Sequence, residues 1–288
     1  MKHIVGFSGG IDSQAAARYV LDRYPKEDVI LLNSDAGGNE HPLTTAFVEE
    51  YSRAVHPVIV VQPLVSDLWK TEGFAENSRG IDGSEVLTFE RMIEFKGRPP
   101  SRKAQFCTEI LKLRPQKRWL LANVDDEYER YTGLRRAESA NRKNTPIREW
   151  DSYFDCYVNH PLAMWDDKQA CFDLIKGEPI NPLYSLGFGR VGCAPCINSG
   201  KADIARWADR FPEMIDKIRE WEERSRFTFF PPCIPNNALR IDARGNLTKH
   251  NYIDEVVAWA KTDFGGLQFN ILRDLDRPNC ESKYGLCE

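Results

Sequence analysis

Short apolar runs alternate with helical patterns along the first sixty residues. The run His3–Phe7 precedes a helical pattern over residues 14–21, and the run Asp28–Asn33 precedes one over residues 42–55. The β-branched run Val58–Val61 follows. Continuous apolar runs are typical of strands buried on both faces, and their alternation with helices predicts a parallel sheet covered on both sides. Ligands bind such sheets at the carboxyl ends of the strands.

The pattern becomes less regular farther along the chain. Glycines and prolines interrupt residues 66–106, which we expect to form a loop-rich insertion near the site. We expect a helix over residues 108–123, a strand over residues 128–133 and a helix from Trp165 to about Lys176.

A turn rich in proline and glycine after Gly177 indicates a boundary. The predicted fold class is therefore α/β. We expect a doubly wound, mainly parallel sheet in a nucleotide-binding domain over residues 1–185. A mainly helical and loop segment that bears cysteines and binds a metal or cluster should occupy residues 186–288.

The segment Ser8-Gly9-Gly10-Ile11-Asp12-Ser13 lies between the first predicted strand and the first predicted helix. Adjacent glycines let the backbone turn sharply and approach a ligand closely, and the amides that begin a helix attract anions. This interpretation predicts a phosphate chain as ligand, with Asp12 as a candidate for Mg²⁺. An ordinary turn in which Asp12 or Ser13 caps the helix is the alternative.

Polar residues also follow other predicted strands. Asp35 follows the second strand, where it can face a ribose or a phosphate-bound metal, or can form a turn. Gly133 ends a later strand, and Arg135 and Arg142 come soon after it. Guanidinium groups suit phosphate oxygens. The alternative is a solvated helix face on which Glu138 pairs with Arg142.

Charge and hydropathy narrow the class of protein. The net charge is only −4, so a nucleic-acid site would have to be a local basic patch. No run approaches eighteen apolar residues, and Met1 leads directly into a predicted strand, so we expect a cytoplasmic protein with no membrane contact. In a reducing compartment, eight cysteines indicate metal ligands, redox chemistry or burial rather than disulfides.

The pair Cys193-Ala194-Pro195-Cys196 can chelate a metal, hold part of an iron–sulfur cluster or act as a redox pair. A four-ligand site needs two more ligands. Cys107 is one candidate, because it lies at a predicted helix N-terminus near Arg102, Lys103 and Lys112, where a thiolate is favoured. A buried cysteine is the alternative there. The other candidates are Cys233, Cys280 and Cys287, whereas Cys156 and Cys171 are typical of core cysteines.

Together these motifs resemble the phosphoadenosine-phosphosulfate-reductase-like branch of the PP-loop superfamily of N-type ATP pyrophosphatases. The resemblance spans about residues 3–200. It rests on Ser8–Ser13, on Cys107 with Lys112 and Pro115, on Gly133-x-Arg135 with Glu138 and Arg142, on Trp165, and on Asn181-Pro182-Leu183-Tyr184 leading to Cys193 and Cys196.

The resemblance implies an adenine nucleotide alpha hydrolase-like fold that binds ATP and Mg²⁺. It implies that Ser8, Gly9, Gly10, Ile11, Asp12, Ser13, Asp35 and Gly133 hold the nucleotide, and that Asp12, Lys112, Arg135 and Arg142 act in catalysis. It also implies a [4Fe-4S] cluster on Cys107, Cys193, Cys196 and Cys287, with Cys280 or Cys233 as other choices for the fourth ligand. Zinc is the alternative metal.

Sulfonucleotide reductases of this branch generally have a degenerate phosphate loop, and the loop here is intact. Because its loop is intact, the chain resembles DNA phosphorothioation proteins of the DndC and SspD type, or a phage-type relative, more than it resembles the reductases. Such a protein would activate DNA or another nucleic acid with ATP and take sulfur from a cysteine desulfurase. Basic residues from Arg98 to Arg118 suit a polyanionic acceptor, or they form a solvated face.

Two alternatives remain. One is a reductase of adenosine phosphosulfate or phosphoadenosine phosphosulfate that uses Cys287 as nucleophile. The other is a non-catalytic nucleic-acid-binding subunit with a structural metal site.

Overall fold

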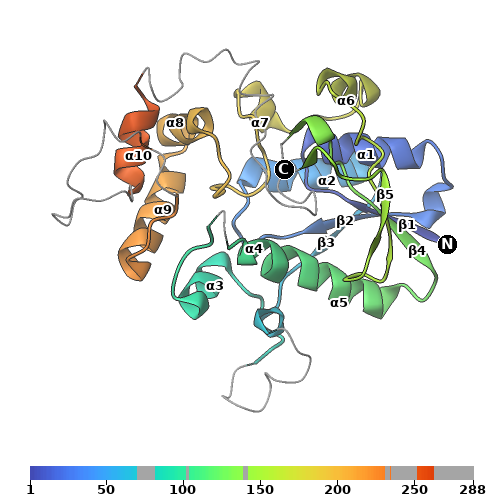
Figure 1. Ribbon diagram of the computed structural model, residues 1–288, viewed down its shortest axis with the longest axis horizontal. Helices are drawn as coiled ribbons and strands as arrows, with labels where there is room; N and C mark the ends of the chain where they lie inside the picture. The colour runs from blue at the N-terminus through green and yellow to red at the C-terminus, as the bar shows by residue number, and fades with distance from the viewer. Residues whose placement is uncertain (70–81, 102–103, 139–141, 231–233, 235–251, 263–288) are drawn as a thin grey trace.

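A six-stranded sheet in the order β3-β2-β1-β4-β6-β5 forms the centre of the molecule (Figure 1). The computed structural model describes residues 1–69, 82–101, 104–138, 142–230, 234 and 252–262. The strands are β1 (Lys2–Gly6), β2 (Val29–Ser34), β3 (Val58–Val61), β4 (Tyr128–Tyr131), β5 (Arg148–Asp151) and β6 (Cys156–Asn159). All neighbouring strands are parallel except β5 and β6. The predicted α/β class with a mainly parallel sheet is confirmed.

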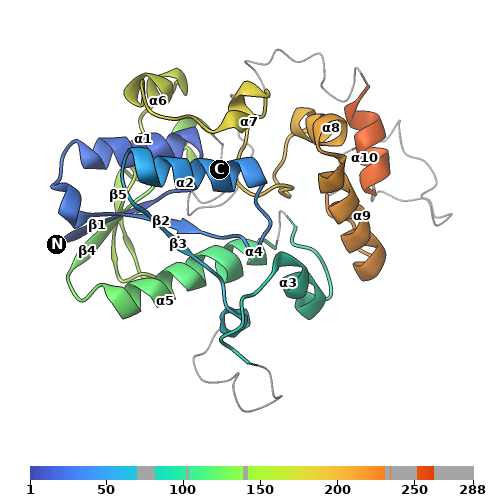
Figure 2. The same ribbon diagram turned by 180° about the vertical axis from the view of Figure 1, so that it is seen from behind.

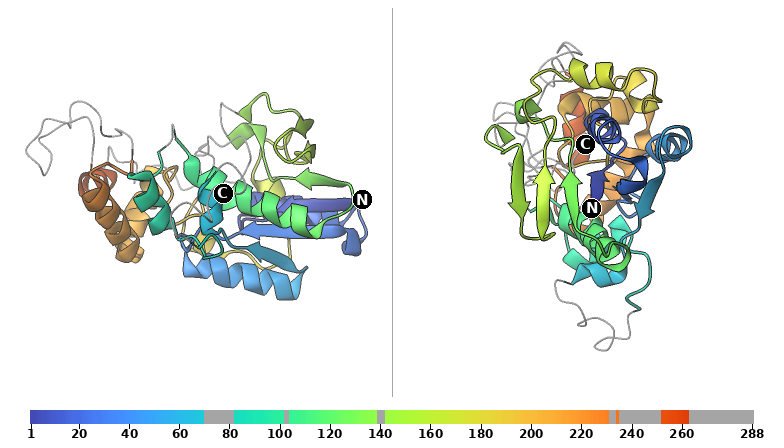
Figure 3. Two further views of the ribbon diagram at one scale, coloured as in Figure 1. Left: turned by 90° about the horizontal axis from the view of Figure 1, so that it is seen from below. Right: turned by 90° about the vertical axis from the view of Figure 1, so that its right-hand side faces the viewer.

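Helices cover both faces of this sheet. α1 (Ile11–Leu21) and α2 (Pro42–Ala54) lie on one face, and α5 (Arg114–Asn123) lies on the other (Figures 1 and 3). Val5 and Leu31 pack on the side of α1 and α2, whereas Ile4 and Leu32 pack on the side of α5. Because successive residues of a strand point to opposite faces, a strand buried on both sides is apolar throughout. The doubly wound arrangement follows from these runs.

The remaining helices surround this core. They are α3 (Phe89–Lys96), α4 (Phe106–Thr108), α6 (Gln169–Leu174), α7 (Pro182–Ser185), α8 (Lys201–Arg210), α9 (Pro212–Ser225) and α10 (Ile253–Ala260), with short 3-10 helices at Lys26–Asp28, Val65–Leu68 and Arg136–Glu138. A π-helical turn over Glu109–Leu113 joins α4 to α5. Residues 106–123 are thus one continuous helix, which confirms the helix expected over residues 108–123.

α8, α9 and α10 lie together at one end of the molecule (Figure 2). Their apolar side chains form a second core with α3. Leu183 and Phe188, on either side of the predicted boundary between residues 185 and 186, both belong to this core. The division into two domains stays a prediction. No helix in the described part of the chain is long and apolar enough to span a membrane.

Three elements differ from the sequence prediction. α3 lies within the segment expected to be mostly loop; Thr88 caps its first turn by accepting a hydrogen bond from the Arg91 N–H. Gly97 ends it with a φ of +68°. The strands β5 and β6 were not predicted, because β5 carries charged side chains on both of its faces and lacks the apolar alternation of a strand. Their hairpin forms one edge of the sheet (Figure 3).

Candidate functional site

The segment Ser8–Ser13 forms a tight turn between β1 and α1 at the carboxyl edge of the sheet. Gly9 has a φ of +79°, a conformation that favours glycine. The Ser13 hydroxyl accepts a hydrogen bond from the Ser8 N–H at 3.1 Å and donates one to the Gly10 carbonyl at 2.8 Å. The predicted strand, turn and helix are present, and the nucleotide-binding role of the turn stays a prediction.

Side chains from the segment around α7 form hydrogen bonds with this turn. The Ile11 N–H donates to the Tyr184 hydroxyl at 3.1 Å, and the Asn181 amide donates to the Gly9 carbonyl at 3.4 Å. Asn181 also donates to the Thr44 hydroxyl at 3.1 Å. The loop conformation is therefore held by side chains from α2 and from the stretch that leads to the cysteine pair.

The chain after β4 meets the phosphate loop directly, because β4 is the neighbour of β1. A Cβ atom on Gly133 would lie 2.4 Å from the backbone carbonyl atoms of Asp12 and 2.6 Å from the Ser13 nitrogen. Only glycine fits this contact. The buried Arg135 donates through Nε to Oδ1 of the buried Asp12 at 3.1 Å. The structure thus brings together Asp12, Gly133 and Arg135.

Two further predicted residues have structural partners. Arg142 pairs with Glu138, as the alternative interpretation expected, but Arg142 is buried, so the idea of a solvated helix face was wrong. Asp35 accepts a hydrogen bond from the Gly38 N–H at 2.9 Å. This contact forms the turn that was one of the two interpretations of Asp35 from the sequence. Roles for Arg142 and Asp35 toward a nucleotide stay predictions.

Cys107, Cys193 and Cys196 are near enough to influence one another electrostatically. Burial, aided by the two other cysteines, raises the pKa of the Cys107 thiol to about 12. Burial therefore outweighs the helix terminus in setting the Cys107 pKa, and the role of Cys107 as a ligand stays a prediction. Burial also raises the pKa of Cys193 to about 11, although Lys112 opposes this. The Asn198 N–H donates to the Cys196 sulfur at 3.4 Å, a contact that favours a thiolate ligand.

Lys112 and Glu40 complete the surroundings of these sulfurs. Burial lowers the pKa of the Lys112 amine, but Cys193 and Glu40 more than offset this, so the net shift is upward. Burial raises the pKa of Glu40 to about 7, while Lys112 opposes the shift. Glu40 forms a backbone bridge with Cys193, and the Ala194 N–H donates to the Asn39 carbonyl at 2.8 Å.

A small cavity of about 20 Å³ lies beside the phosphate loop and reaches Gly192, the residue before the cysteine pair. Its lining residues come from the ends of β1 and β2, from the helix that contains α5 and from the approach to the cysteine pair. They are Gly6, Phe7, Ser8, Leu32, Asn33, Ser34, Glu40, Lys112, Gln116 and Gly192. Ser8 begins the loop, and Gly192 directly precedes Cys193. The phosphate loop and the approach to the cysteine pair therefore line the same small cavity.

Sequence reasoning missed Glu40 and Gln116 in this cavity. Glu40 follows the second strand within a polar segment, and polar residues beyond a buried strand are a signal for the ligand edge of a parallel sheet. Gln116 carried no signal, because a glutamine within a helix usually faces solvent.

The predicted basic segment is largely engaged inside the protein. Lys112 is buried. Arg114 donates to the Asp67 carbonyl at 2.6 Å and to Glu109 at 2.7 Å, and Arg118 lies 3.2 Å from the Asp67 carboxylate. Arg102 and Lys103 lie outside the described residues. The described members of the segment thus do not form a continuous solvated face.

The metal assignment stays a prediction. Cys233, Cys280 and Cys287, the candidates for a fourth ligand, lie outside the described residues. Among the residues that the structure covers, no three His, Cys, Asp or Glu side chains are placed to hold a single metal ion. Cys156 and Cys171 are buried, as expected for core cysteines.

Comparison with known proteins yields one consistent result. The family model of the phosphoadenosine phosphosulfate reductase domain matches residues 2–199. An uncharacterized 37.8 kDa protein of Escherichia phage 186 is 29% identical over 99% of this chain and 96% of its own length. An adenosine 5'-phosphosulfate reductase of Rhizobium tropici is 36% identical over 40% of this chain and 62% of the reductase. The solved phosphoadenylyl-sulfate reductase of Candida auris is similar over 68% of this chain and 83% of that one, with 16% identity and a TM-score of 0.46.

Proposed function

Because the chain belongs to the phosphoadenosine phosphosulfate reductase domain family, we propose that it is an ATP pyrophosphatase that adenylylates an acceptor for sulfur insertion. The proposed acceptor is DNA, in phosphorothioate modification, and the proposed sulfur donor is a cysteine desulfurase. The observation that carries this proposal is the cavity shared by the intact loop at Ser8 and by the approach to Cys193.

The first step is nucleotide activation. An acceptor oxygen attacks the α-phosphorus of ATP, the bond from that phosphorus to the bridging oxygen breaks, and pyrophosphate leaves. The amides of the loop from Ser8 to Ser13 would hold the phosphates, and Arg135 and Arg142 would neutralise the charge that shifts during transfer. Asp12 would place Mg²⁺ against phosphate oxygens, where the ion supplies further charge neutralisation. A sulfur nucleophile then displaces AMP.

The cysteines suit a [4Fe-4S] cluster. Three thiols lie near enough to interact electrostatically, a backbone N–H donates to one sulfur, and the Lys112 ammonium offsets thiolate charge. Cys107, Cys193 and Cys196, with Cys287 as fourth ligand, would hold the cluster, and Cys280 or Cys233 are the other choices for that ligand. When bound, the cluster supplies redox chemistry beside the nucleotide.

Product analysis tests the reaction. Protein purified without oxygen is given ATP and Mg²⁺, with and without DNA and a cysteine desulfurase, and pyrophosphate is measured. We expect pyrophosphate release that Gly9→Val reduces about a hundredfold, because a β-branched residue cannot adopt a φ of +79° without strain. Gly97→Val is the matched control: it also has a positive φ of +68°, but it lies at the end of α3 and should leave the reaction intact.

Absence of pyrophosphate release with every acceptor, together with salt-sensitive DNA binding, would contradict the reaction and favour the non-catalytic binding subunit.

Metal content tests the cluster. Protein purified without oxygen should be brown and contain iron and acid-labile sulfide, and Cys107→Ser should lose both, because three ligands hold a cluster poorly. Cys171→Ser, a buried cysteine outside the site, should retain them. A colourless protein with stoichiometric zinc would rule out the cluster.

A second candidate is a sulfonucleotide reductase. Similarity to a protein named adenosine 5'-phosphosulfate reductase favours it. It would use Cys287 as nucleophile. Sulfite release from adenosine phosphosulfate in the absence of ATP, lost in Cys287→Ser, would establish this activity in place of the first.

A further inference from the structure

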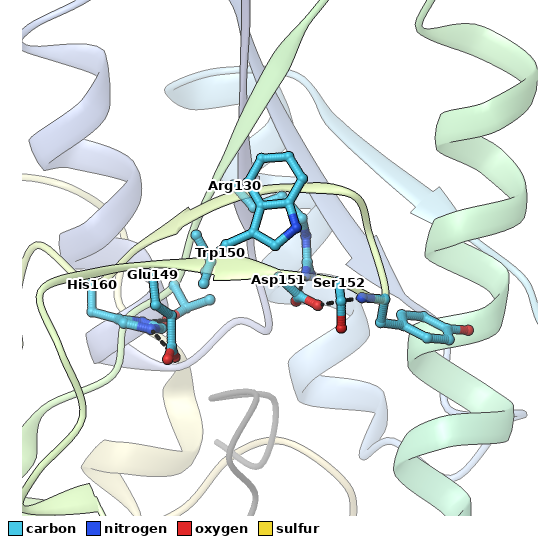
Figure 4. A pocket seen from close by; sticks show the side chains of 9 residues that line it. Arg130, Glu149, Trp150, Asp151, Ser152 and His160 are labelled. Atoms are coloured by element: carbon cyan, nitrogen blue, oxygen red, sulfur yellow. Dashed lines mark hydrogen bonds and ion pairs between the residues drawn. The ribbon is translucent and has the colours of Figure 1, made fainter.

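A second cleft lies over the neighbouring strands β4, β6 and β5, at the edge of the sheet away from β3 (Figure 4). Its volume is about 200 Å³. The lining residues are Arg130, Thr132, Glu149, Trp150, Asp151, Ser152, Tyr153, Val158 and His160. None of them belongs to the loop or to the cysteine cluster.

His160 is the polar group at the inner wall of this cleft. Only 2% of it is exposed, and its Nδ1 atom is 2.7 Å from the Thr132 hydroxyl. Its Nε2 atom is buried without a hydrogen bond, and its nearest charged group is a Glu149 carboxylate oxygen 3.5 Å away. A buried polar atom without a hydrogen bond is costly, so a ligand that supplies one is favoured here.

The charges of the cleft exclude an anionic ligand. Arg130 is already engaged: it donates to the Gln116 side-chain oxygen at 3.0 Å, lies 3.5 Å from Asp151 and stacks on Phe154. Burial lowers the pKa of His160, and Arg142 and Arg130 act in the same direction while Glu149 opposes them. The imidazole is therefore neutral, and the partly exposed Glu149 carboxylate remains. Such a site suits a neutral ligand that donates hydrogen bonds.

We propose that this cleft binds a nucleobase that carries an exocyclic amino group. The amino group donates to the Glu149 carboxylate, the pairing by which acidic side chains read cytosine. A ring nitrogen or carbonyl of the base pairs with Nε2 of His160, and the flat ring lies against Val158 and the Tyr153 ring. Bases are recognised in this manner when they leave the stack of a strand.

The position of the cleft suits an acceptor strand. Thr132 directly precedes Gly133, which contacts the phosphate loop, so a base in the cleft lies beside the nucleotide site. Gln116 contacts Arg130 on the cleft side and donates to the Ser34 hydroxyl at 2.8 Å on the side of the other cavity. The inference rests on the proposed function in one respect: that function supplies the nucleic-acid acceptor from which the base would come.

Cytidine and uridine test the inference sharply, because they differ only along one edge of the ring: cytidine has an amino group beside an unprotonated ring nitrogen, and uridine has an oxygen beside a ring N–H. Calorimetric titration of the full chain should give cytidine a dissociation constant about tenfold below that of uridine. Glu149→Gln should abolish this preference, since the amide can donate to the uridine oxygen. Glu149 is 46% exposed, so the variant should fold, and Glu220→Gln, on the exposed face of α9, should keep the preference.

Equal affinity of cytidine and uridine, or an unchanged preference in Glu149→Gln, would overturn the inference. So would nucleoside binding that ATP displaces and Gly9→Val abolishes, because the nucleoside would then occupy the phosphate-loop site. Pyrophosphate release is measured separately. A protein that releases pyrophosphate but does not discriminate cytidine from uridine contradicts only this inference, and the reverse result contradicts only the proposed function.

Discussion

Gly133 sets how closely the chain after β4 approaches the phosphate loop. Gly133→Ala would force a Cβ atom to within 2.4 Å of the Asp12 backbone, where no flexible side chain can move aside. We expect the free energy of unfolding to fall by about 2 kcal/mol and ATP affinity to fall with it, since the loop must shift. Denaturant unfolding and nucleotide titration measure both.

Gly97→Ala is the control for Gly133→Ala. Gly97, unlike Gly133, has a positive φ, but no atom lies within 4 Å of its Cβ position. We expect a loss of about 1 kcal/mol without a change in ATP affinity. Equal ATP affinity in Gly133→Ala and the native protein would contradict the role of this contact.

Single residues differed in how far sequence could predict them. Gly9 and Gly133 follow predicted strands, so their place at the ligand edge could be inferred, and a positive φ or a close contact explains each glycine. Glu40 and His160 could not be inferred in the same way. Their chemistry depends on burial and on partners distant in sequence, such as Lys112 for Glu40 and Thr132 for His160.

At the scale of elements, α5 links the two cavities through one buried side chain. Gln116→Leu would remove one hydrogen bond from the Arg130 guanidinium and one from the Ser34 hydroxyl. We expect the free energy of unfolding to fall by about 2 kcal/mol, because each buried group that loses a hydrogen bond costs about 1 to 3 kcal/mol. Chemical denaturation measures the change.

Leu121→Gln tests whether the position on the helix decides the effect. Leu121 belongs to the same helix but is 65% exposed, so the reverse exchange there should change the free energy of unfolding by no more than about 0.5 kcal/mol. Equal effects of the two variants would contradict the buried link.

The elements that could be predicted from the sequence are those whose apolar residues follow one clear pattern, either a continuous run or a helical repeat. β1 and β2 contain the apolar runs Ile4-Val5 and Val29–Leu32, and β3 consists only of valine and isoleucine. α2 repeats its apolar positions with helical spacing. β5 could not be predicted from its pattern, Arg148-Glu149-Trp150-Asp151, because it is an edge strand that exposes most of its side chains. Its aromatic Trp150 packs on Tyr157 across the hairpin rather than into a core.

At the scale of the molecule, Glu222 connects two of the helices that lie together at one end, α9 and α10. Its carboxylate accepts hydrogen bonds at 2.8 Å from the N–H groups of Phe229 and Ile253, and so connects α9 to α10. Burial raises its pKa from 4.5 to about 7, although both N–H groups oppose the shift. The folded state therefore binds this proton more tightly than the unfolded chain. The stabilisation is complete below pH 4.5 and is lost as the pH rises through about 7.

Glu222→Gln removes this dependence, because the amide does not titrate. Between pH 5 and pH 8, the variant should gain about 2 kcal/mol of stability relative to the native protein. Urea unfolding at both pH values measures the difference. Glu220→Gln, an exposed neighbour on α9, should follow the native protein at both. A constant difference between Glu222→Gln and the native protein would contradict the raised pKa.

Only part of the arrangement of the candidate site could be predicted from the sequence. The motif order predicted that Cys107, Cys193 and Cys196 act together; the fold brings them near enough to influence one another electrostatically, and their shared role stays a prediction. Their connection to the loop could not be predicted. It depends on the backbone bridge between Glu40 and Cys193, which has no sequence signature.

The central claim is that the phosphate loop and the cysteines form one site. The most direct measurement is the absorption and electron paramagnetic resonance spectrum of protein purified without oxygen, recorded before and after ATP is added. We predict a spectral change that saturates with ATP and is absent in Gly9→Val. An iron–sulfur spectrum that stays the same while ATP binds would contradict the claim.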